Sequence, residues 1–300
     1  MIDQIKPEWL AVDWGTSTLR VWAMQGATVL DQVQSDDALT GRHPEGFAPT
    51  LQAVTAHWHL PRPVMAIACG MVGARQGWVE APYQTLPCTP IAPGFAHLRS
   101  DVFDLHVISG LCQQRPNDVM RGEETQIAGF LALNPNWDGV ICLPGTHTKW
   151  AQVSAGEVIS FQTYMTGEMF GLLAGQSVLR HSVQTEGWED AAFDMAVSEA
   201  LSRPEKLAAR LFAIHADDRM DGTAPEAAKA RLSGLLIGAE LAAARPYWLG
   251  QNLAIIGADP QAALYARALD KQGAPATLAD APRMTLAGLC AAFRLLKGNA

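Results

Sequence analysis

The sequence has no excess of basic residues. Twenty-two Lys and Arg stand against 30 Asp and Glu, so the 300-residue chain carries a formal net charge of -8. Proteins that bind nucleic acid or an anionic membrane surface through charge need a basic face. The composition therefore argues against both partners. It leaves open an anionic small molecule held by local N–H groups, a few cationic side chains and a metal ion.

The sequence also lacks paired cysteines and long apolar runs. Its five cysteines are odd in number and include no C-x-x-C pair, which favours reduced thiols in a cytoplasmic protein. No apolar stretch approaches 18 residues and no apolar signal segment opens the chain, so we expect neither a membrane span nor a secretory leader. No G-x-G-x-x-G follows the first predicted strand, which disfavours a dinucleotide dehydrogenase.

The chain is rich enough in apolar residues to bury more than one core. Apolar side chains make up 49% of its 300 residues, a length that is comfortable for two domains. Short apolar runs alternate with longer segments of helical spacing, so we expect an α/β fold. A predicted helix ends at Asn134-Pro135-Asn136, and this break divides the chain into expected domains at residues 1–136 and 137–300.

A polar turn between two apolar runs lies near the start of the chain. Residues 9–12 lead to Asp13, and Gly15-Thr16-Ser17-Thr18 separates them from a second run at residues 19–24. This pattern predicts a β-hairpin. Its N–H groups and hydroxyls suit a phosphate, and its carboxylate suits the divalent cation that accompanies one. An ordinary hairpin whose polar turn faces water explains the same residues.

The same pattern occurs again in the second half of the chain. An apolar run at residues 140–143 enters Gly145-Thr146-His147-Thr148, and further β-type runs follow at residues 150–153 and 158–161. Two such hairpins facing each other across a cleft would hold a polyphosphate from both sides. The repetition is more specific than either turn alone.

A glycine-containing loop and a proline-rich segment follow a short apolar strand at residues 64–68. Small and flexible residues at 69–78 predict a binding loop at the strand end, with a structural turn as the alternative. Residues 80–100 form either part of a substrate pocket or a surface flap. The candidate contacts in these two segments are Met71, Gly73, Arg75 and Tyr83.

Two further segments contain candidate catalytic or nucleotide-binding residues. Residues 118–133 have helical spacing, with Glu123 and Glu124 in the expected first turn. The helix dipole favours acids there regardless of function, whereas a functional interpretation makes one of them a general base, and we favour Glu123. A predicted strand at residues 252–256 ends in Gly257-Ala258-Asp259-Pro260, which suits either a bound nucleotide or a plain turn between strand and helix.

These motifs resemble, in their order along nearly the whole chain, the actin-like ATPase and sugar-kinase superfamily. D-W-G-T-S-T and L-P-G-T-H-T-K-W are similar to its two phosphate hairpins, and I-I-G-A-D-P to its adenosine turn. R-G-E-E-T-Q-I-A-G-F is similar to the helix start that carries the base of the carbohydrate kinases. Together with C-G-M-V-G-A-R-Q-G-W-x-E-A-P-Y, they more narrowly resemble the 2-dehydro-3-deoxygalactonokinase family.

The resemblance implies two actin-like (ribonuclease H-like) domains, each a mixed five-stranded sheet flanked by helices, that close on ATP, Mg²⁺ and a sugar acid. The implied reaction is ATP-dependent phosphorylation of the terminal (6-) hydroxyl of 2-dehydro-3-deoxy-D-galactonate in galactonate catabolism. The alternatives are a kinase for a related sugar or sugar acid, and a phosphatase of the same fold that hydrolyses polyphosphate or nucleotides.

The resemblance also implies a role for each candidate residue. Asp13 would place Mg²⁺, because Leu143-Pro144 stand where the superfamily's second hairpin often begins with an acid. Glu123 would accept the hydroxyl proton as the catalytic base. Phosphate and adenosine contacts would come from Gly15, Thr16, Ser17, Gly145, Thr146, Thr148, Gly257 and Ala258.

Two assignments stay open at this stage. Arg75 is the candidate for the substrate carboxylate, because a guanidinium binds that group with two hydrogen bonds, and Arg20 is its alternative as a structural partner on the second strand. The apolar C-terminal helix expected at residues 284–296 serves either a core or an interface, which leaves a homodimer open.

Overall fold

The structure is a computed structural model that describes residues 5–36, 44–258 and 260–298. Its contacts divide the chain into two compact units. The first unit is Met1–Asp138, Val153–Ser160 and Asp280–Ala300, and the second is Gly139–Gln152 and Phe161–Ala279. The first division lies close to the boundary expected at residue 136, but the end of the chain returns to the first unit.

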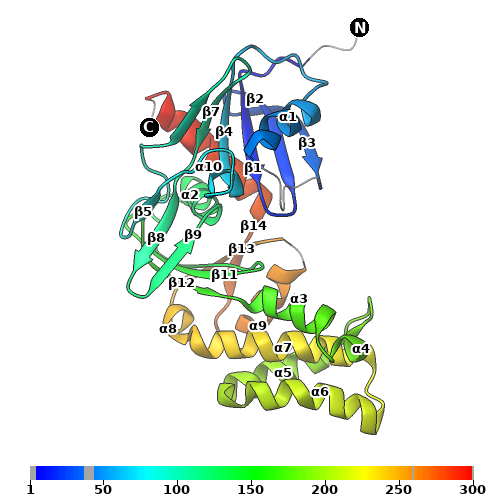
Figure 1. Cartoon of the computed structure of the whole chain (residues 1–300). Coiled ribbons are helices and arrows are strands. Elements are labelled where there is room, and N and C mark those ends of the chain that lie inside the picture. Colours follow the sequence, from blue (N-terminus) through cyan, green and yellow to red (C-terminus); the bar gives the residue numbers. More distant parts are fainter. Residues whose placement is uncertain (1–4, 37–43, 259, 299–300) are drawn as a thin grey trace. The chain divides into compact units, whose positions relative to one another are not determined.

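A six-stranded mixed sheet forms the centre of the first unit (Figure 1). In the order β3-β2-β1-β4-β7-β6, its strands are β3 (Thr28–Ser35), β2 (Leu19–Gln25), β1 (Trp9–Trp14), β4 (Val64–Gly70), β7 (Phe103–Val107) and β6 (Ala96–Arg99). β1 pairs antiparallel with β2 and parallel with β4, which pairs parallel with β7. β6 adds an antiparallel edge, so this sheet has one strand more than expected.

Both faces of this sheet are covered. On one face, Leu10 and Val12 pack in a core with α1 (Phe47–Val54), which follows the short 3-10 helix η1 (Pro44–Gly46). On the other face, Trp9 and Ala11 pack with α10 (Ala281–Leu296), and the Trp9 indole stacks on Phe293 with 4.5 Å between ring centroids. Residues 9–12 of β1 are therefore all apolar, because each face of the sheet has a core. The C-terminal helix serves the core of the first unit.

Two glycines allow α2 (Glu123–Leu133) to lie unusually close to α10. A Cβ at Gly129 would collide with backbone atoms of Met284 and Gly288, and a Cβ at Gly288 would collide with the carbonyl of Thr125. Glycine alone leaves room for backbones at this separation. The crossing fixes the first turn of α2, which carries both candidate acids.

A small sheet precedes α2. Its order is β5-β8-β9, with β5 (Tyr83–Thr85), β8 (Gly110–Gln114) and β9 (Asn117–Met120). The sequence predicts a helix from residue 118, and this start is wrong, because β9 pairs antiparallel with β8. Strand pairing with a neighbour outweighs the helical spacing of these residues. The segment at residues 80–100 contains β5 and β6 and is therefore not a plain loop.

A five-stranded mixed sheet forms the centre of the second unit. In the order β12-β11-β10-β13-β14, its strands are β12 (Glu157–Tyr164), β11 (Thr148–Ser154), β10 (Gly139–Leu143), β13 (Leu253–Gly257) and β14 (Ala276–Asp280). β10 and β13 pair in parallel. Their apolar runs are buried, as the sequence predicts for central strands.

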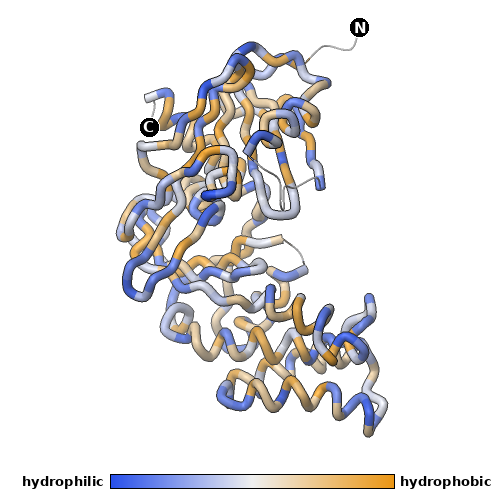
Figure 2. The backbone as a smooth tube through the Cα atoms, in the orientation of Figure 1, coloured by the Kyte–Doolittle hydropathy of each residue, from blue (hydrophilic) through white to orange (hydrophobic). Residues whose placement is uncertain are grey.

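Helices complete the second unit. They are α3 (Thr166–Gln176), α4 (Arg180–Val183), α5 (Asp190–Ser202), η3 (Pro204–Lys206), α6 (Leu207–Asp221), α7 (Pro225–Ala243), α8 (Arg245–Trp248) and α9 (Gln261–Asp270). Along α5, α6 and α7, the tube in Figure 2 alternates between orange and blue, as it does where one helix face is buried and the other meets water. In the part of the chain that the structure describes, no helix is both long and apolar enough to span a bilayer.

Candidate active site

The first hairpin has the form that the sequence predicts. β1 and β2 are joined by a turn that closes where the Gly15 N–H donates to the Thr18 carbonyl at 2.9 Å. Thr16 and Ser17 at its tip are exposed, so their hydroxyls and N–H groups can meet a ligand. A turn that presents several donors is suited to an anion.

Asp13 is held at the base of this hairpin. Its Oδ2 accepts a hydrogen bond from Nη1 of Arg20 at 3.1 Å, and its Oδ1 faces the Cys69 thiol at 3.8 Å. Burial raises the pKa of Asp13, and the Arg20 guanidinium opposes part of that rise. Arg20 is thus a structural partner of Asp13, which is the alternative role that the sequence predicts for it. The weak thiol contact leaves Oδ1 able to bind a cation, and one carboxylate with nucleotide phosphates is a common Mg²⁺ ligand set.

The ends of β1 and β4 and the start of α2 lie against one another within the first unit. Trp14 is in register with Gly70, and a Cβ at Gly70 would collide with the Trp14 carbonyl. Gly122 is the residue before α2, and an ideal Cβ built on it would lie 3.6 Å from the Gly70 Cα. Both glycines have positive φ, +88° and +106°, which favours glycine. The first hairpin and the first turn of α2 are brought together by these contacts.

The two acids of α2 occupy different environments. Glu123 is partly buried and its Oε2 accepts the N–H of Arg121 at 3.1 Å. Glu124 is fully buried and accepts the N–H of Gly122 at 2.7 Å and the Thr125 hydroxyl at 3.0 Å. Burial, followed by the charge of Glu123, raises the pKa of Glu124 to about 8. Glu123 therefore has the access that a base needs, whereas Glu124 has a structural setting.

The structure places the four substrate candidates differently. Arg75 follows the 3-10 helix η2 (Met71–Gly73), its side chain is 83% exposed, and its Nε lies 3.8 Å from Glu80. Gly73 and Tyr83 both contact a different cation, Arg121. An ideal Cβ at Gly73 would lie 2.8 Å from Arg121 Nη1, and the Arg121 guanidinium carbon lies 4.4 Å from the centre of the Tyr83 ring.

Arg121 is a candidate site residue that the sequence motifs alone do not single out. Its Nη2 donates to the Ala81 carbonyl at 2.7 Å. Its Nε and Nη1 are buried and have no hydrogen-bond partner within residues 5–36, 44–258 and 260–298. A buried donor without an acceptor costs about 1–3 kcal/mol. The sequence signal was available, because Arg121 lies two residues before Glu123 in the R-G-E-E motif.

The second hairpin is fixed to the helix that follows its sheet. The Thr146 carbonyl accepts the N–H of Glu168 at 2.9 Å, and Nε2 of His147 lies 2.5 Å from a Glu168 carboxylate oxygen. Gly145 and Thr146 are accessible. Thr148 is fully buried, and its hydroxyl shares a 3.0 Å hydrogen bond with Tyr265, so it supports the turn from behind.

A buried carboxylate anchors this support. Glu240 of α7 accepts the Trp150 indole N–H at 2.7 Å and the Tyr265 hydroxyl at 2.6 Å. Burial raises the pKa of Glu240, and its hydrogen bonds oppose that rise. Tyr265 therefore connects Glu240 to Thr148 and holds the second hairpin in one position.

A cavity of about 730 Å³ opens beside the second hairpin, entirely within the second unit. Its walls include the apolar side chains of Phe170, Trp188 and Leu264, and Gly145 and Thr146 lie at its edge. A large apolar pocket with a few polar groups is typical of a small-molecule site. Its size and its contact with the hairpin suit a purine base and ribose.

Among the described residues of the adenosine turn, Pro260 lines this cavity, whereas Gly257 and Ala258 do not. Gly257 ends β13, and an ideal Cβ there would lie 2.9 Å from the Cβ of Ala262 in α9. The cavity wall continues with Pro260 and Gln261, at the start of α9. Asp259 lies outside the described residues. The adenosine contacts of Gly257 and Ala258 stay predictions. That the two hairpins face each other across a cleft also stays a prediction.

Relatives in sequence match this chain over most of their length. The family described as 2-keto-3-deoxy-galactonokinase matches residues 13–292. The chain is 39% identical over 300 residues to "Probable 2-dehydro-3-deoxygalactonokinase DgoK1" of Rhizobium meliloti (strain 1021), which covers 95% of this chain and 96% of the relative. It is 34% identical to the 2-dehydro-3-deoxygalactonokinase of Escherichia coli (strain K12), over 90% of this chain and 91% of the relative.

Solved structures agree on the fold. A protein from Sinorhizobium meliloti superposes with a TM-score of 0.87 and 36% identity, over 96% of this chain and 99% of the other. The activator of the 2-hydroxyisocaproyl-CoA dehydratase from Clostridium difficile, solved with bound ADPNP, has a TM-score of 0.55 and 11% identity, over 97% and 96% of the two chains. The second likeness shows the fold alone, and the expected actin-like ATPase fold is confirmed. On its sequence, this chain belongs to the 2-keto-3-deoxy-galactonokinase family.

Proposed function

We propose that the protein transfers the terminal phosphoryl group of ATP to the 6-hydroxyl of 2-dehydro-3-deoxy-D-galactonate, forming 2-dehydro-3-deoxy-6-phosphogalactonate in galactonate catabolism. The observation that carries this proposal is the accessible Glu123 at the start of α2, beside the first phosphate hairpin and Asp13. The Escherichia coli relative, a 2-dehydro-3-deoxygalactonokinase, supports the same substrate. An ATP-dependent reaction and five unpaired cysteines fit a cytoplasmic enzyme.

The residues divide the work of phosphoryl transfer among them. Gly15, Thr16 and Ser17 donate to phosphate oxygens from the first hairpin, and Gly145 and Thr146 do so from the second. Oδ1 of Asp13 would hold Mg²⁺, which supplies charge neutralisation at the phosphates when it is bound. Such transfer depends on alignment and charge stabilisation more than on covalent chemistry. The backbone donors serve this purpose because their positions are set by the fold.

Glu123 accepts the proton of the attacking hydroxyl. A positioned base contributes roughly 10²–10⁴-fold to a rate, so we expect Glu123→Gln to lose about that factor in kcat. ATP binding should survive, because this side chain belongs to the acceptor side. Steady-state kinetics with ADP release, together with calorimetric titration of an ATP analogue, measure the two effects.

Glu124→Gln is the matched control, since it changes the neighbouring acid in the same way. It should keep most of the parental kcat at neutral pH, where Glu124 is already protonated. If Glu123→Gln turned over at the parental rate while Glu124→Gln did not, the base would be Glu124.

We infer that Arg121 binds the carboxylate of the sugar acid. Its Nε and Nη1 are buried donors without a partner in the described part of the chain, and a carboxylate accepts such donors. Arg121→Lys should raise the KM for the sugar acid about 10-fold or more, because an ammonium cannot reproduce two directed N–H bonds. The KM for ATP should change little.

Arg75→Ala separates this assignment from the one based on sequence. Arg75 is exposed and near Glu80, so its removal should leave the sugar-acid KM within about twofold. A large rise in KM for Arg75→Ala with none for Arg121→Lys would restore Arg75 as the carboxylate ligand.

One assay tests the substrate and the reaction class together. A panel of 3-deoxy sugar acids and neutral sugars is incubated with ATP and Mg²⁺, and both ADP and free phosphate are measured. ADP formation that requires 2-dehydro-3-deoxy-D-galactonate supports the proposal. Release of free phosphate without any acceptor would instead indicate a phosphatase of the same fold.

A further inference from the structure

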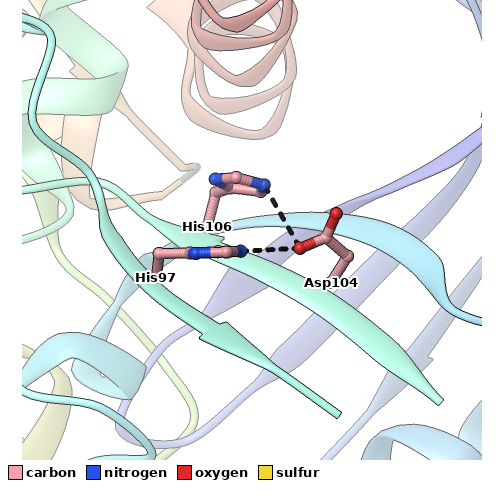
Figure 3. Close-up of side chains that lie close together, drawn as sticks. All are labelled: His97, Asp104 and His106. Carbon is pink, nitrogen blue, oxygen red and sulfur yellow. Dashed lines mark hydrogen bonds and ion pairs between the residues drawn. The ribbon is translucent and has the colours of Figure 1, made fainter. Parts of the chain in front are cut away.

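Three potential metal ligands gather at the edge of the first sheet, in a cluster of His97, Asp104 and His106 (Figure 3). His97 of β6 is the register partner of His106 in β7, so their side chains lie on the same face. Asp104 lies two residues before His106 and shares that face as well. The cluster is thus built by regular strand pairing rather than by a loop.

The three side chains converge. His97 Nε2 lies 2.6 Å and His106 Nε2 lies 3.7 Å from the same oxygen, Oδ1 of Asp104. The two imidazole rings are stacked, with 4.6 Å between centroids and 18° between planes. All three ligand atoms lie within 4.8 Å of one another. Ligands of a tetrahedral zinc ion are roughly 3.3 Å apart, so small side-chain rotations would close this set around one ion.

We propose that His97, Asp104 and His106 form a binding site for a divalent transition-metal ion, with zinc as the best match. Two imidazoles and one carboxylate are ligands that zinc binds readily, with water in the fourth position. Mg²⁺ prefers oxygen ligands and is a poor match. The site is therefore distinct from Asp13, which lies on β1, with β4 between β1 and β7.

The burial of the cluster suits an ion that enters from solvent. The His97 side chain is 48% exposed, whereas those of His106 and Asp104 are 16% and 22% exposed. The side chain of His97 is therefore exposed enough to rotate and admit the ion, whereas those of His106 and Asp104 are more enclosed. A bound ion would join the edge strand β6 to β7 through side chains, in addition to their backbone hydrogen bonds, and so stabilise the edge.

One neighbouring residue opposes the ion. Arg99 of β6 is the register partner of Asp104, and its positive charge acts on that carboxylate. It should repel a cation bound beside Asp104. Removal of this charge should therefore strengthen metal binding, an effect that a nonspecific surface site elsewhere would not show.

Tag-free full-length protein is titrated with Zn²⁺ by calorimetry, and Co²⁺ is used as a spectroscopic probe. We expect one ion per chain, visible absorption bands of low-symmetry Co²⁺, and a rise in the thermal unfolding midpoint when Zn²⁺ is added. His97→Ala and His106→Ala should each weaken binding by about 10-fold or more and abolish the thermal shift. Arg99→Gln should tighten binding by roughly 3- to 10-fold.

His57→Ala is the matched control, because His57 also lies near a carboxylate, with Nε2 3.7 Å from Asp31. It should bind Zn²⁺ like the parent. Kinase activity without added zinc should be retained in all four variants, which shows that they are folded. Absence of a stoichiometric site in the parent protein would overturn the proposal, as would equal binding by the parent, His97→Ala and His106→Ala.

Discussion

Glu123 and Glu124 are adjacent in sequence, yet they meet different surroundings at the start of α2. The helix directs Glu124 into the interior, where it accepts two hydrogen bonds, and leaves Glu123 partly accessible. One acid is therefore suited to structure and the other to proton transfer.

The buried acid makes stability depend on pH. Glu124 keeps its proton up to about pH 8 in the folded chain, whereas its ordinary pKa is 4.5. Its contribution to stability is therefore complete below about pH 4.5 and is lost as the pH rises toward 8. Glu124→Gln has no such proton to lose. The stability of the variant relative to the parent should rise between pH 5 and pH 8, by at most about 1.4 kcal/mol per pH unit.

Guanidinium unfolding at several pH values measures this difference. Glu205→Gln is the control, because Glu205 is exposed. The difference in unfolding free energy between this variant and the parent should stay constant between pH 5 and pH 8. Parallel pH profiles for the parent and Glu124→Gln would contradict the assignment of a raised pKa.

At the scale of elements, the crossing of α2 and α10 positions the candidate base. Gly288 lies against the backbone of Thr125, in the first turn after Glu123. Gly288→Ala adds a methyl group where the two backbones are in contact, so the helices must separate. We expect the unfolding free energy to fall by about 1–3 kcal/mol and kcat to fall as well. Denaturant unfolding and steady-state kinetics measure both.

Gly171→Ala in α3 is the matched substitution, since an added Cβ there meets no described atom within 4 Å apart from the adjacent residues and backbone of its own helix. It should be neutral or raise stability by up to about 1 kcal/mol, because alanine favours a helix. If Gly288→Ala were as stable and active as Gly171→Ala, the close crossing would have no role.

At the scale of the whole molecule, α10 completes a unit whose six-stranded sheet precedes the second unit in sequence. Its Leu289 and Ala292 are fully buried in the core against Trp9 and Ala11. A chain that ends at Ala279 should therefore lose the fold of the first unit and keep that of the second. Limited proteolysis with mass spectrometry should find cleavage concentrated in residues 5–138 and sparse in residues 161–279. A chain that ends at Gly298 is the control and should resist cleavage in both ranges.

Much of the fold could be predicted from apolar runs and helical spacing. β1, β4, β10 and β13 are short apolar runs whose burial leaves little alternative. β8 and β9 were missed because their residues are largely polar and their pairing partners, not their composition, define them. The return of α10 to the first unit was missed because an apolar helix does not specify which sheet it covers.

The candidate site was only partly predictable for a similar reason. Local sequence patterns are enough to predict the two turns rich in glycine and hydroxyl residues, and the acids at the start of a helix. Thr148 was assigned to phosphate, although it lies buried behind the turn on Tyr265, 117 residues away. The position of the Arg121 side chain is set by its contacts with Ala81 and Tyr83, which lie some 40 residues earlier in the sequence. Contacts across such distances are set by tertiary packing, which local patterns do not record.

The return of α10 also orders events during synthesis. The ribosome releases Trp9, Trp22 and Met24 before the second unit, but the helix that covers their face of the sheet emerges only after that unit. At roughly 5–20 residues per second, the nascent chain must wait for the whole second unit before this face can close. During that interval the apolar side chains that α10 covers stay uncovered, and transiently exposed apolar surface of this kind promotes aggregation.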